Sequence, residues 1–450
     1  MSSIAGRIIL GVGHHRLWAD EPAVGRRGSG PIRSDPTYDT PMPRILLVLP
    51  TATYRARDFL AAARALDVEL IIASERRAAM SETMGDLGLV VDLSRPEAAA
   101  DAIVARAQDL ALDAVLAADE QGVLVAALAA ARLGLPHNPP QSVAATIDKI
   151  AMRRAFETAG IPQPEYRIAE SGADVASLAG ELGPPVVVKP VSLSASRGVI
   201  RADDPRAAGE AAKRVRAILA DAREDPQGPL LVERYLPGTE VAVEGLMRGG
   251  ALEILALFDK PDPLEGPYFE ETIYVTPSRL PAETREAVEV LAGQAAAALG
   301  LVEGPIHAEL RIDQGSVRML ELGARSIGGL CSRSLRFGTD ASLEELILRH
   351  ALGHSLEDLS REAAASGVMM LPIPRAGTLK EVLGQEEARA VPGVTGLEIS
   401  IAPGKAVRTL PEADRYLGFL FARGETAAAV ERALRTAHER LEIVIGDPPG

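Results

Sequence analysis

The stretch from Arg44 to Gly134 alternates short apolar runs with longer helical patterns, and this alternation constrains the fold more than any other feature. The runs RILLVLP, VELIIAS and AVLAAD predict buried strands. The segments RDFLAAARAL, PEAAADAIVARAQDL and QGVLVAALAAARLG have helical periodicity, and the last ends at a glycine. Strands that alternate with helices predict a parallel sheet with helices on both faces. We therefore expect an N-terminal α/β domain over residues 42–138.

The composition of the chain argues against several classes of protein. A formal net charge of −14 argues against a sequence-independent nucleic-acid binder, although a local basic pocket can still hold a small anion. Cys331 is the only cysteine, which excludes an internal disulfide and favours a reducing compartment. No apolar run approaches the ~20 residues that cross a bilayer, and no signal-peptide pattern opens the chain. These features predict a cytoplasmic protein without membrane contact.

The rest of the chain divides into a tail and three regions. Residues 1–41 are polar and rich in glycine and proline, and predict a disordered tail, with a docking arm as the alternative. Residues 139–245 form a central region, in which PPVVVKPVSLSASRGVIRA predicts strand, loop and strand. Residues 246–355 carry a hairpin, and residues 356–450 are β-rich and end in the predicted helix TAAAVERALRTAHERLEI. The fold class is α/β, or α+β overall.

The hairpin HAELRIDQGSVRMLELGAR, residues 307–325, places carboxylates in short apolar runs. His307 and Glu309 share one face of the first strand because side chains alternate. A two- or four-residue loop would put Glu309 opposite Leu320 and send the two glutamates to opposite faces. A three-residue loop DQG, with its glycine left-handed, places His307 opposite Glu321 and Glu309 diagonal to it. We expect the three-residue loop.

Two co-facial carboxylates are hard oxygen ligands that suit Mg²⁺ beside phosphate oxygens, and the alternative is a solvent-exposed polar face. Lys189 ends an apolar strand and precedes a loop of small residues, an arrangement that presents an ammonium and backbone N–H groups to phosphates. The alternative for Lys189 is a strand-end lysine that reaches solvent. Lys149 taken alone could be an ordinary lysine on a helix surface. The stretch ERYLPGTE, which contains Glu233 and Glu240, does not by itself indicate a binding site.

The order of these motifs is more specific than any one of them. DK, VVVKP, SASRG, VERYLPGTE, HAE and ELGAR follow one another as in the ATP-grasp superfamily, which the chain resembles over roughly residues 42–450. Within it, the spacing of Gly304, His307 and Glu309, the run ELGARSIGG and the tail LGFLFARGET resemble the L-amino acid ligases, which join amino acids into dipeptides. The resemblance implies an ATP-grasp fold: an N-terminal parallel α/β domain, a β-rich lid in the central region, a catalytic core with the hairpin, and a C-terminal β-rich subdomain.

The resemblance implies a nucleotide-binding role for nine residues. Lys149 and Lys189 would contact the ATP phosphates, and Ser194, Ser196 and Gly198 would belong to a flexible phosphate loop. At the other end, Glu233 would accept from the adenine amino group beside backbone contacts at Tyr235 and Leu236, and Glu240 would bind the ribose.

The resemblance also implies a metal site and a catalytic site. Glu309 and Glu321 would hold Mg²⁺, with Mn²⁺ as an alternative, and Arg325 would stabilise the acyl phosphate and the tetrahedral species. His307 would lie near the metal and the substrate. Many relatives have asparagine two residues after the second glutamate, whereas Gly323 offers no ligand there. A second metal site is therefore in question.

The implied activity is an ATP-dependent carboxylate–amine ligase that forms an amide or peptide bond through an acyl phosphate and releases ADP and phosphate. Its partners would be a small-molecule carboxylate and an amine, one of them an amino acid, and family resemblance suggests a homodimer. One alternative is a biotin-carboxylase-like or purine-pathway ATP-grasp enzyme, although the chain has no biotin-attachment M-K-M. Another is a nucleotide-binding regulator without catalysis, which Gly323 makes conceivable. Bicarbonate-dependent ATP turnover, or ATP binding without turnover, would distinguish these alternatives.

Overall fold

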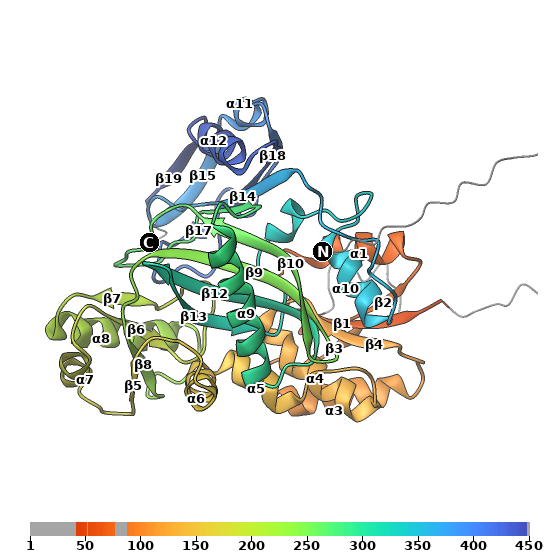
Figure 1. Ribbon diagram of the computed structural model, residues 1–450, viewed down its shortest axis with the longest axis horizontal. Helices are drawn as coiled ribbons and strands as arrows, with labels where there is room; N and C mark the ends of the chain where they lie inside the picture. Colours follow the sequence, from red (N-terminus) through yellow and green to blue (C-terminus); the bar gives the residue numbers. More distant parts are fainter. Residues whose placement is uncertain (1–41, 52, 77–87, 448–450) are drawn as a thin grey trace, which may run out of the picture. The chain divides into compact units, whose positions relative to one another are not determined.

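The computed structural model of the protein describes residues 42–51, 53–76 and 88–447 (Figure 1). The predicted tail, residues 1–41, lies outside the described residues. The described chain has a mixed α/β architecture with one parallel sheet and further sheets in which the paired strands are antiparallel. None of its described helices is long and apolar enough to cross a membrane.

The N-terminal region is a four-stranded parallel sheet with helices on both faces, as predicted. Its strands follow the order β3-β2-β1-β4, with β1 (Arg44–Val48), β2 (Glu69–Ser74), β3 (Leu89–Val90) and β4 (Ala114–Ala117). Its helices are α1 (Ala56–Ala65), α3 (Pro96–Ala107) and α4 (Glu120–Leu133). Along β1, Ile45 and Leu47 pack in the cluster that contains α1, whereas Leu46 and Val48 pack with α3 and α4. This alternation explains why every residue from Ile45 to Val48 is buried.

The central region begins with two helices, followed by a small antiparallel sheet. The helices are α5 (Pro140–Ile147) and α6 (Lys149–Ala159), and Gly160 ends α6 in the left-handed conformation. The sheet has the order β5-β8-β6-β7, with β5 (Tyr166–Ala169), β6 (Val186–Pro190), β7 (Ile200–Ala202) and β8 (Leu230–Arg234). Helices α7 (Val175–Leu182) and α8 (Pro205–Asp221) share its apolar core. We call residues 166–235 the lid.

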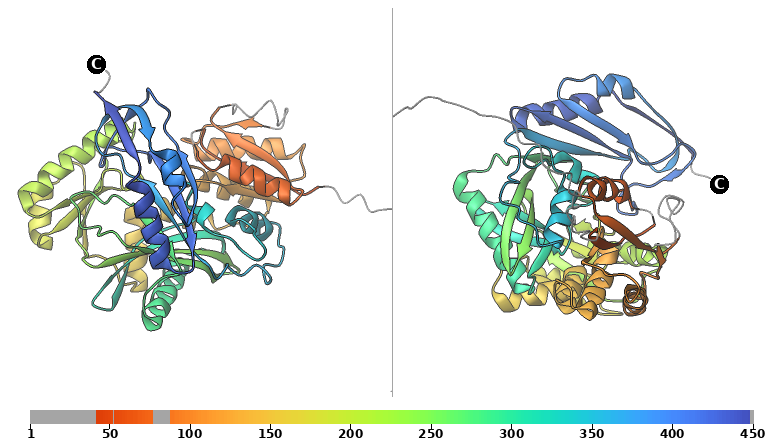
Figure 2. Two further views of the ribbon diagram at one scale, coloured as in Figure 1. Left: turned by 90° about the horizontal axis from the view of Figure 1, so that it is seen from above. Right: turned by 90° about the vertical axis from the view of Figure 1, so that its right-hand side faces the viewer.

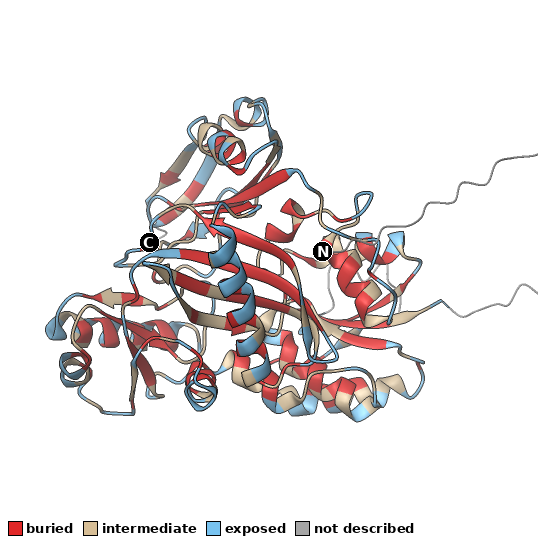
Figure 3. Ribbon diagram, viewed as in Figure 1, coloured by how far each residue is buried: buried red, intermediate tan, exposed pale blue. Residues whose placement is uncertain are grey.

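An eight-stranded sheet forms the centre of the described chain, with the order β13-β12-β9-β10-β11-β14-β18-β16. The strands are β9 (Thr239–Arg248), β10 (Ala251–Lys260), β11 (Ile273–Thr276), β12 (Glu303–Asp313), β13 (Ser316–Gly323), β14 (Ala365–Leu371), β16 (Val394–Ile399) and β18 (Gly418–Gly424). Helix α9 (Ala282–Ala298) packs on one face, and the strands beneath it are largely buried (Figure 3). The short helices η2 (Cys331–Ser334) and α10 (Leu343–Ala351) follow the hairpin. The predicted boundary at residue 245 falls inside β9.

The C-terminal region adds a three-stranded antiparallel sheet, ordered β17-β15-β19 (Figure 2). Its elements are β15 (Gly377–Leu383), α11 (Gln385–Arg389), β17 (Ala406–Val407), α12 (Ala427–His438) and β19 (Glu442–Gly446). The final helix was predicted to extend through LEI, and this prediction was wrong. Helix α12 ends at His438, and the β-branched run EIVIG pairs with β15 instead.

Candidate functional site

A cavity of about 350 Å³ opens where the lid, the central sheet, the N-terminal region and a C-terminal loop meet. All but one of the residues predicted for the site line this cavity: Lys149, Lys189, Ser194, Ser196, Glu233, Tyr235, Leu236, Glu240, His307, Glu309, Glu321 and Arg325. Gly198 is the exception. Its φ is +74°, and a Cβ there would lie 3.2 Å from Pro190, so this glycine shapes the loop backbone without lining the cavity.

The hairpin brings its two glutamates together by a different route from the predicted one. Asp313 pairs with Ser316, so the loop has two residues, not three. A β-bulge at Leu320 then inserts one extra residue into β13 and restores the parity. As a result Glu309 lies directly opposite Glu321, and His307 pairs with Gly323. The prediction that Glu309 and Glu321 lie on the same face of the hairpin was right. The predicted three-residue loop and the predicted diagonal placement of the two glutamates were wrong.

A break between α5 and α6 turns Lys149 into the protein. Asp148 is extended, with ψ of 103°, and its carboxylate caps α6 by accepting from the N–H groups of Ile150 and Ala151, both at 2.9 Å. Lys149 is therefore the first residue of α6, and it is buried. The cap therefore separates α5 from α6.

Lys189 reaches the cavity because strand β6 alternates its side chains. Val186 and Val188 pack in the lid core, whereas Lys189 points to the other face and is 4% exposed. Its Nζ lies 2.8 Å from Glu233, whose other oxygen accepts from Arg153 at 2.5 Å. Burial opposes the ionisation of Glu233, but Arg153 and Lys189 outweigh it and lower the pKa of this carboxyl to about 2. The predicted hydrogen bond from adenine to Glu233 stays a prediction.

Glu321 lies between the two lysines. Its carboxylate is 3.4 Å from Lys189 Nζ and 3.7 Å from Lys149 Nζ. Lys149 also donates to the carbonyl of Leu193, at 2.8 Å, at the start of the serine-rich loop. Two ammonium groups from different elements thus converge on one carboxylate that pairs with Glu309.

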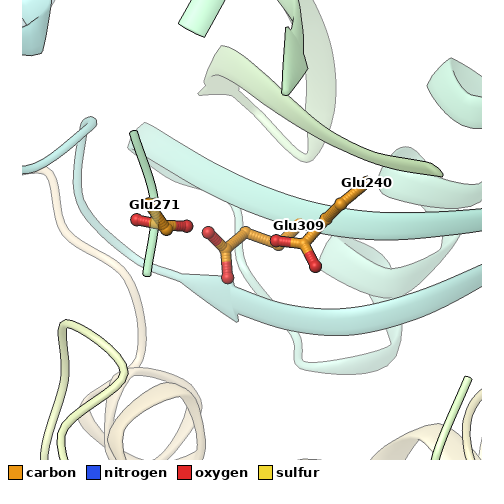
Figure 4. A group of neighbouring side chains, drawn as sticks. All are labelled: Glu240, Glu271 and Glu309. Carbon is orange, nitrogen blue, oxygen red and sulfur yellow. The ribbon is translucent and has the colours of Figure 1, made fainter. Parts of the chain in front are cut away.

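A second cluster surrounds Lys260, the last residue of β10. Its buried Nζ lies 2.7 Å from both Glu240 and Glu309 and also contacts Glu271. One oxygen from each of the three glutamates lies within 4.8 Å of the others. Figure 4 shows the Glu309 carboxylate between those of Glu271 and Glu240. Carboxylate oxygens at this spacing fit a hard divalent cation as well as an ammonium.

The clustered charges shift their own pKa values. Burial raises the pKa of Glu271 to about 7, with Lys260 opposing and Glu309 adding to the rise. For Glu309, burial is outweighed by Lys260 and His307, which hold its pKa well below the usual range. For Lys260, burial is outweighed by the three carboxylates, which hold its pKa well above the usual range. Lys260 is therefore a fixed internal cation.

His307 is held by Glu244, which lies beside it on β9. Its Nδ1 contacts the Glu244 carboxylate, and its Nε2 lies 3.6 Å from Glu309. Burial opposes protonation, but Glu244 raises the pKa of His307 to about 9, so the ring is an imidazolium at neutral pH. The second Glu244 oxygen accepts from the N–H of Ile327 at 2.9 Å, which fixes the loop after β13.

Arg325 is held from the N-terminal region. Its Nε donates to Glu120 at 3.2 Å, and Glu120 is the first residue of α4, three residues beyond the end of β4. Burial of Arg325 is outweighed by Glu120, which raises the arginine's pKa. A Cβ at Gly323 would lie 3.3 Å from Arg325 Cγ, so the missing side chain leaves room for this arginine.

The opposite end of the cavity is shaped by Arg311, which extends from β12. Its guanidinium donates to Glu240 at 2.9 Å and to the carbonyls of Leu236 and Leu264, at 3.1 and 2.6 Å. The N–H of Tyr235 donates to the Pro185 carbonyl at 3.0 Å. Among the described residues, the Leu236 N–H donates to no protein acceptor, which leaves one backbone donor available at this end of the cavity.

Sequence reasoning missed six residues that hold this site: Glu120, Arg153, Glu244, Lys260, Glu271 and Arg311. Lys260 ends the apolar run ALEILALFDK, which is the same signal that drew attention to Lys189. Glu244 and Arg153 gave no such signal. Each contacts the site only through residues distant in the sequence, Glu244 through His307 and Arg153 through Glu233.

Comparisons with known proteins agree with this geometry. A family model described as an ATP-grasp domain matches residues 182–334, and one described as L-amino acid ligase C-terminal domain 2 matches residues 369–446. Alanine–anticapsin ligase of Bacillus subtilis strain 168 is 29% identical over 255 residues, 53% of this chain and 53% of that protein. D-Alanine–D-alanine ligase of Gloeobacter violaceus is 33% identical over 213 residues, 45% of this chain and 67% of that protein.

Among the solved structures that this chain resembles is an amino acid ligase that matches it along most of both chains. The crystal structure of an L-amino acid ligase from Bacillus licheniformis has a TM-score of 0.79 and 25% identity, and the match covers 91% of this chain and all of that one. The chain spans between 50% and 72% of the length of the curated relatives it matches. From the match to the Gloeobacter ligase, the two domain models and the shared fold, we conclude that this chain belongs to the ATP-grasp family and carries the C-terminal domain of the L-amino acid ligases.

Proposed function

We propose that this protein is an ATP-dependent carboxylate–amine ligase that forms an amide bond with at least one amino acid substrate. The observation that carries the proposal is the convergence of Lys149 and Lys189 on Glu321, opposite Glu309 and in one cavity with Arg325. Phosphoryl transfer requires positioning and neutralisation of charge more than covalent participation by the protein. This cavity supplies cations that can neutralise phosphate charge and carboxylates that can position a metal ion.

The nucleotide would bind with adenine at the hinge of residues 235–236. The Leu236 N–H can donate to an adenine ring nitrogen, and Glu233 is the predicted acceptor for the adenine amino group. Arg311 fixes this hinge through the Leu236 carbonyl. We propose that Glu240 receives the ribose hydroxyls and that Ser194 and Ser196 cover the phosphates.

The chain's own cations would prepare the carboxylate substrate for attack. Lys149 and Lys189 would neutralise the phosphates, as Lys189 exchanges its contact with Glu321 for one with a phosphate oxygen. Glu309 and Glu321 would hold Mg²⁺, which, when bound, supplies charge neutralisation at the phosphates. Transfer of the γ-phosphoryl group from ATP to an oxygen of the substrate carboxylate would release ADP and give an acyl phosphate, whose leaving group is phosphate.

Arg325 would then stabilise the oxyanion that forms when the amine attacks the acyl carbon, since a guanidinium binds an oxyanion through paired N–H donors. Glu120 keeps that guanidinium in place from the N-terminal region. His307, as an imidazolium held by Glu244, adds a further fixed positive charge beside Glu309. Closure of the lid would exclude water from the acyl phosphate.

The test is phosphate release from ATP and Mg²⁺ with pooled amino acids, followed by mass spectrometry of the products. Amino-acid-dependent release with a new amide mass supports the ligase and identifies both substrates. Turnover only with bicarbonate favours the carboxylase alternative, and tight ATP binding without turnover in any pool favours the regulator. Weak ATP binding without turnover rejects the proposed site. The homodimer, the cytoplasmic location and the use of Mn²⁺ remain predictions.

A further inference from the structure

A second cleft, which shares Asp414 and Arg415 with the cavity described above, lies between the lid and the C-terminal region. Its volume is about 780 Å³. One wall comes from the end of α8 and from the lid loop, through Asp221, Arg223 and Arg197. The other comes from the segment around β17, including Lys405 and Arg408. The volume falls within the range of pockets that hold small molecules.

The walls of this cleft are basic in a chain whose net charge is −14. Five cationic side chains line it, against two carboxylates, an excess of three positive charges. The cations are Arg197, Arg223, Lys405, Arg408 and Arg415, and the carboxylates are Asp221 and Asp414. A low-dielectric cleft lined by one sign of charge concentrates the opposite ion.

The two carboxylates pair with only three of these five cations, and Arg415 pairs with Asp414 at 3.1 Å. Asp221 is shared between Arg197, at 2.9 Å, and Arg408, at 2.5 Å. Across the chain as described, Arg223 and Lys405 form no ion pair, and the buried Nε of Arg197 has no hydrogen-bond partner. Arg223 and Lys405 are exposed, so their charges are available to an anion in the cleft.

The remaining lining is apolar. Ile373, Ile401 and Val407 are each less than 8% exposed and lie at the wall of the cleft. Because these side chains already pack in the core of the C-terminal region, the accessible lining of the cleft is mainly its charged groups. Guanidinium groups favour phosphate because their forked N–H donors match its oxygens.

We propose that this cleft binds a phosphate-bearing anion, either a phosphorylated small molecule or free phosphate, at a site distinct from that of ATP. The ligand would bridge the lid and the C-terminal region, because its cationic partners come from both. Arg197 belongs to the loop of residues 192–198, so the occupied cleft would also hold that loop.

The test measures binding of phenyl phosphate and of inorganic phosphate to the full chain by isothermal titration calorimetry. Mg²⁺ and a non-hydrolysable ATP analogue are present throughout, to fill the cavity of the proposed ligase site. The double variant Arg223→Glu/Lys405→Glu reverses two exposed charges in the cleft. The matched control Arg206→Glu/Lys213→Glu reverses two exposed charges elsewhere on α8 and changes the net charge equally.

We expect one equivalent of phosphate ester to bind, with affinity reduced about tenfold or more in the cleft variant and little changed in the control. Tighter binding of phenyl phosphate than of inorganic phosphate would identify a phosphorylated organic ligand, and the reverse would identify free phosphate. The proposal is overturned if neither probe binds, if the cleft variant binds as well as the parent, or if the control loses affinity equally.

Discussion

Glu309 and Glu321 lie directly opposite each other on β12 and β13, although the two-residue turn between those strands would by itself pair Glu309 with Leu320. The bulge at Leu320 corrects the register by one residue. The Leu320 carbonyl still has a hydrogen-bond partner, because it accepts from the buried Arg153 at 2.6 Å. The bulge therefore joins the metal-binding carboxylates proposed above to the pair formed by Arg153 and Glu233.

We expect Glu321→Ala to lower ATP turnover about a hundredfold, because it removes a proposed metal ligand and leaves two lysines without their carboxylate. The rate of phosphate release at saturating ATP and Mg²⁺ measures this. Glu253→Ala, at an exposed position on β10, is the matched control and should leave the rate unchanged. Parental turnover in the Glu321 variant would rule out a catalytic role for the hairpin carboxylates.

Lys260→Met should destabilise the protein by about 3–5 kcal/mol, because Glu240, Glu271 and Glu309 would remain buried together without their internal cation. Added Mg²⁺ or Mn²⁺ should then raise the melting temperature of the variant more than that of the parent. Thermal unfolding with and without the metal measures both effects. An equal metal response in the two proteins would show that the three carboxylates do not take up a divalent cation.

How much of this site the sequence predicts depends on how local each signal is. The α/β alternation from Arg44, the strand carrying Lys189 and the shared face of His307 and Glu309 follow from periodicity within one element. The bulge at Leu320 has no such signature, because it depends on the pairing of β13 with β12. Glu244 likewise reads as one residue of a buried strand until β9 lies beside β12 and places it next to His307.

Glu120→Gln should lower kcat about tenfold while leaving ATP affinity nearly unchanged, because Glu120 contacts Arg325 and neither of the predicted phosphate-binding lysines. Steady-state kinetics together with calorimetric titration of an ATP analogue separates the two quantities. Lys189→Met serves as the contrasting variant and should weaken ATP binding. If Glu120→Gln instead weakened ATP binding and spared kcat, the positioning role of Glu120 would be wrong.

Glu233 should make the stability of the protein depend on pH below about 5. Arg153 and Lys189 overcome the cost of its burial and depress its folded-state pKa to about 2 from its ordinary value of 4.5, which corresponds to stability on the order of 3 kcal/mol. Because the folded pKa is lowered, this contribution is complete above the unfolded pKa and is lost as pH falls toward 2. Glu233→Gln removes the titrating group.

The difference in unfolding free energy between the parent and Glu233→Gln should therefore be constant above about pH 5.5 and shrink as the pH is lowered toward 3. Urea unfolding at half-unit pH intervals measures this difference, and Glu224→Gln, at an exposed position, controls for the loss of one negative charge. A difference that stays constant down to pH 3 would mean that the pKa of Glu233 is the same in the folded and unfolded chains. The two cations would then not stabilise this carboxylate more than water does.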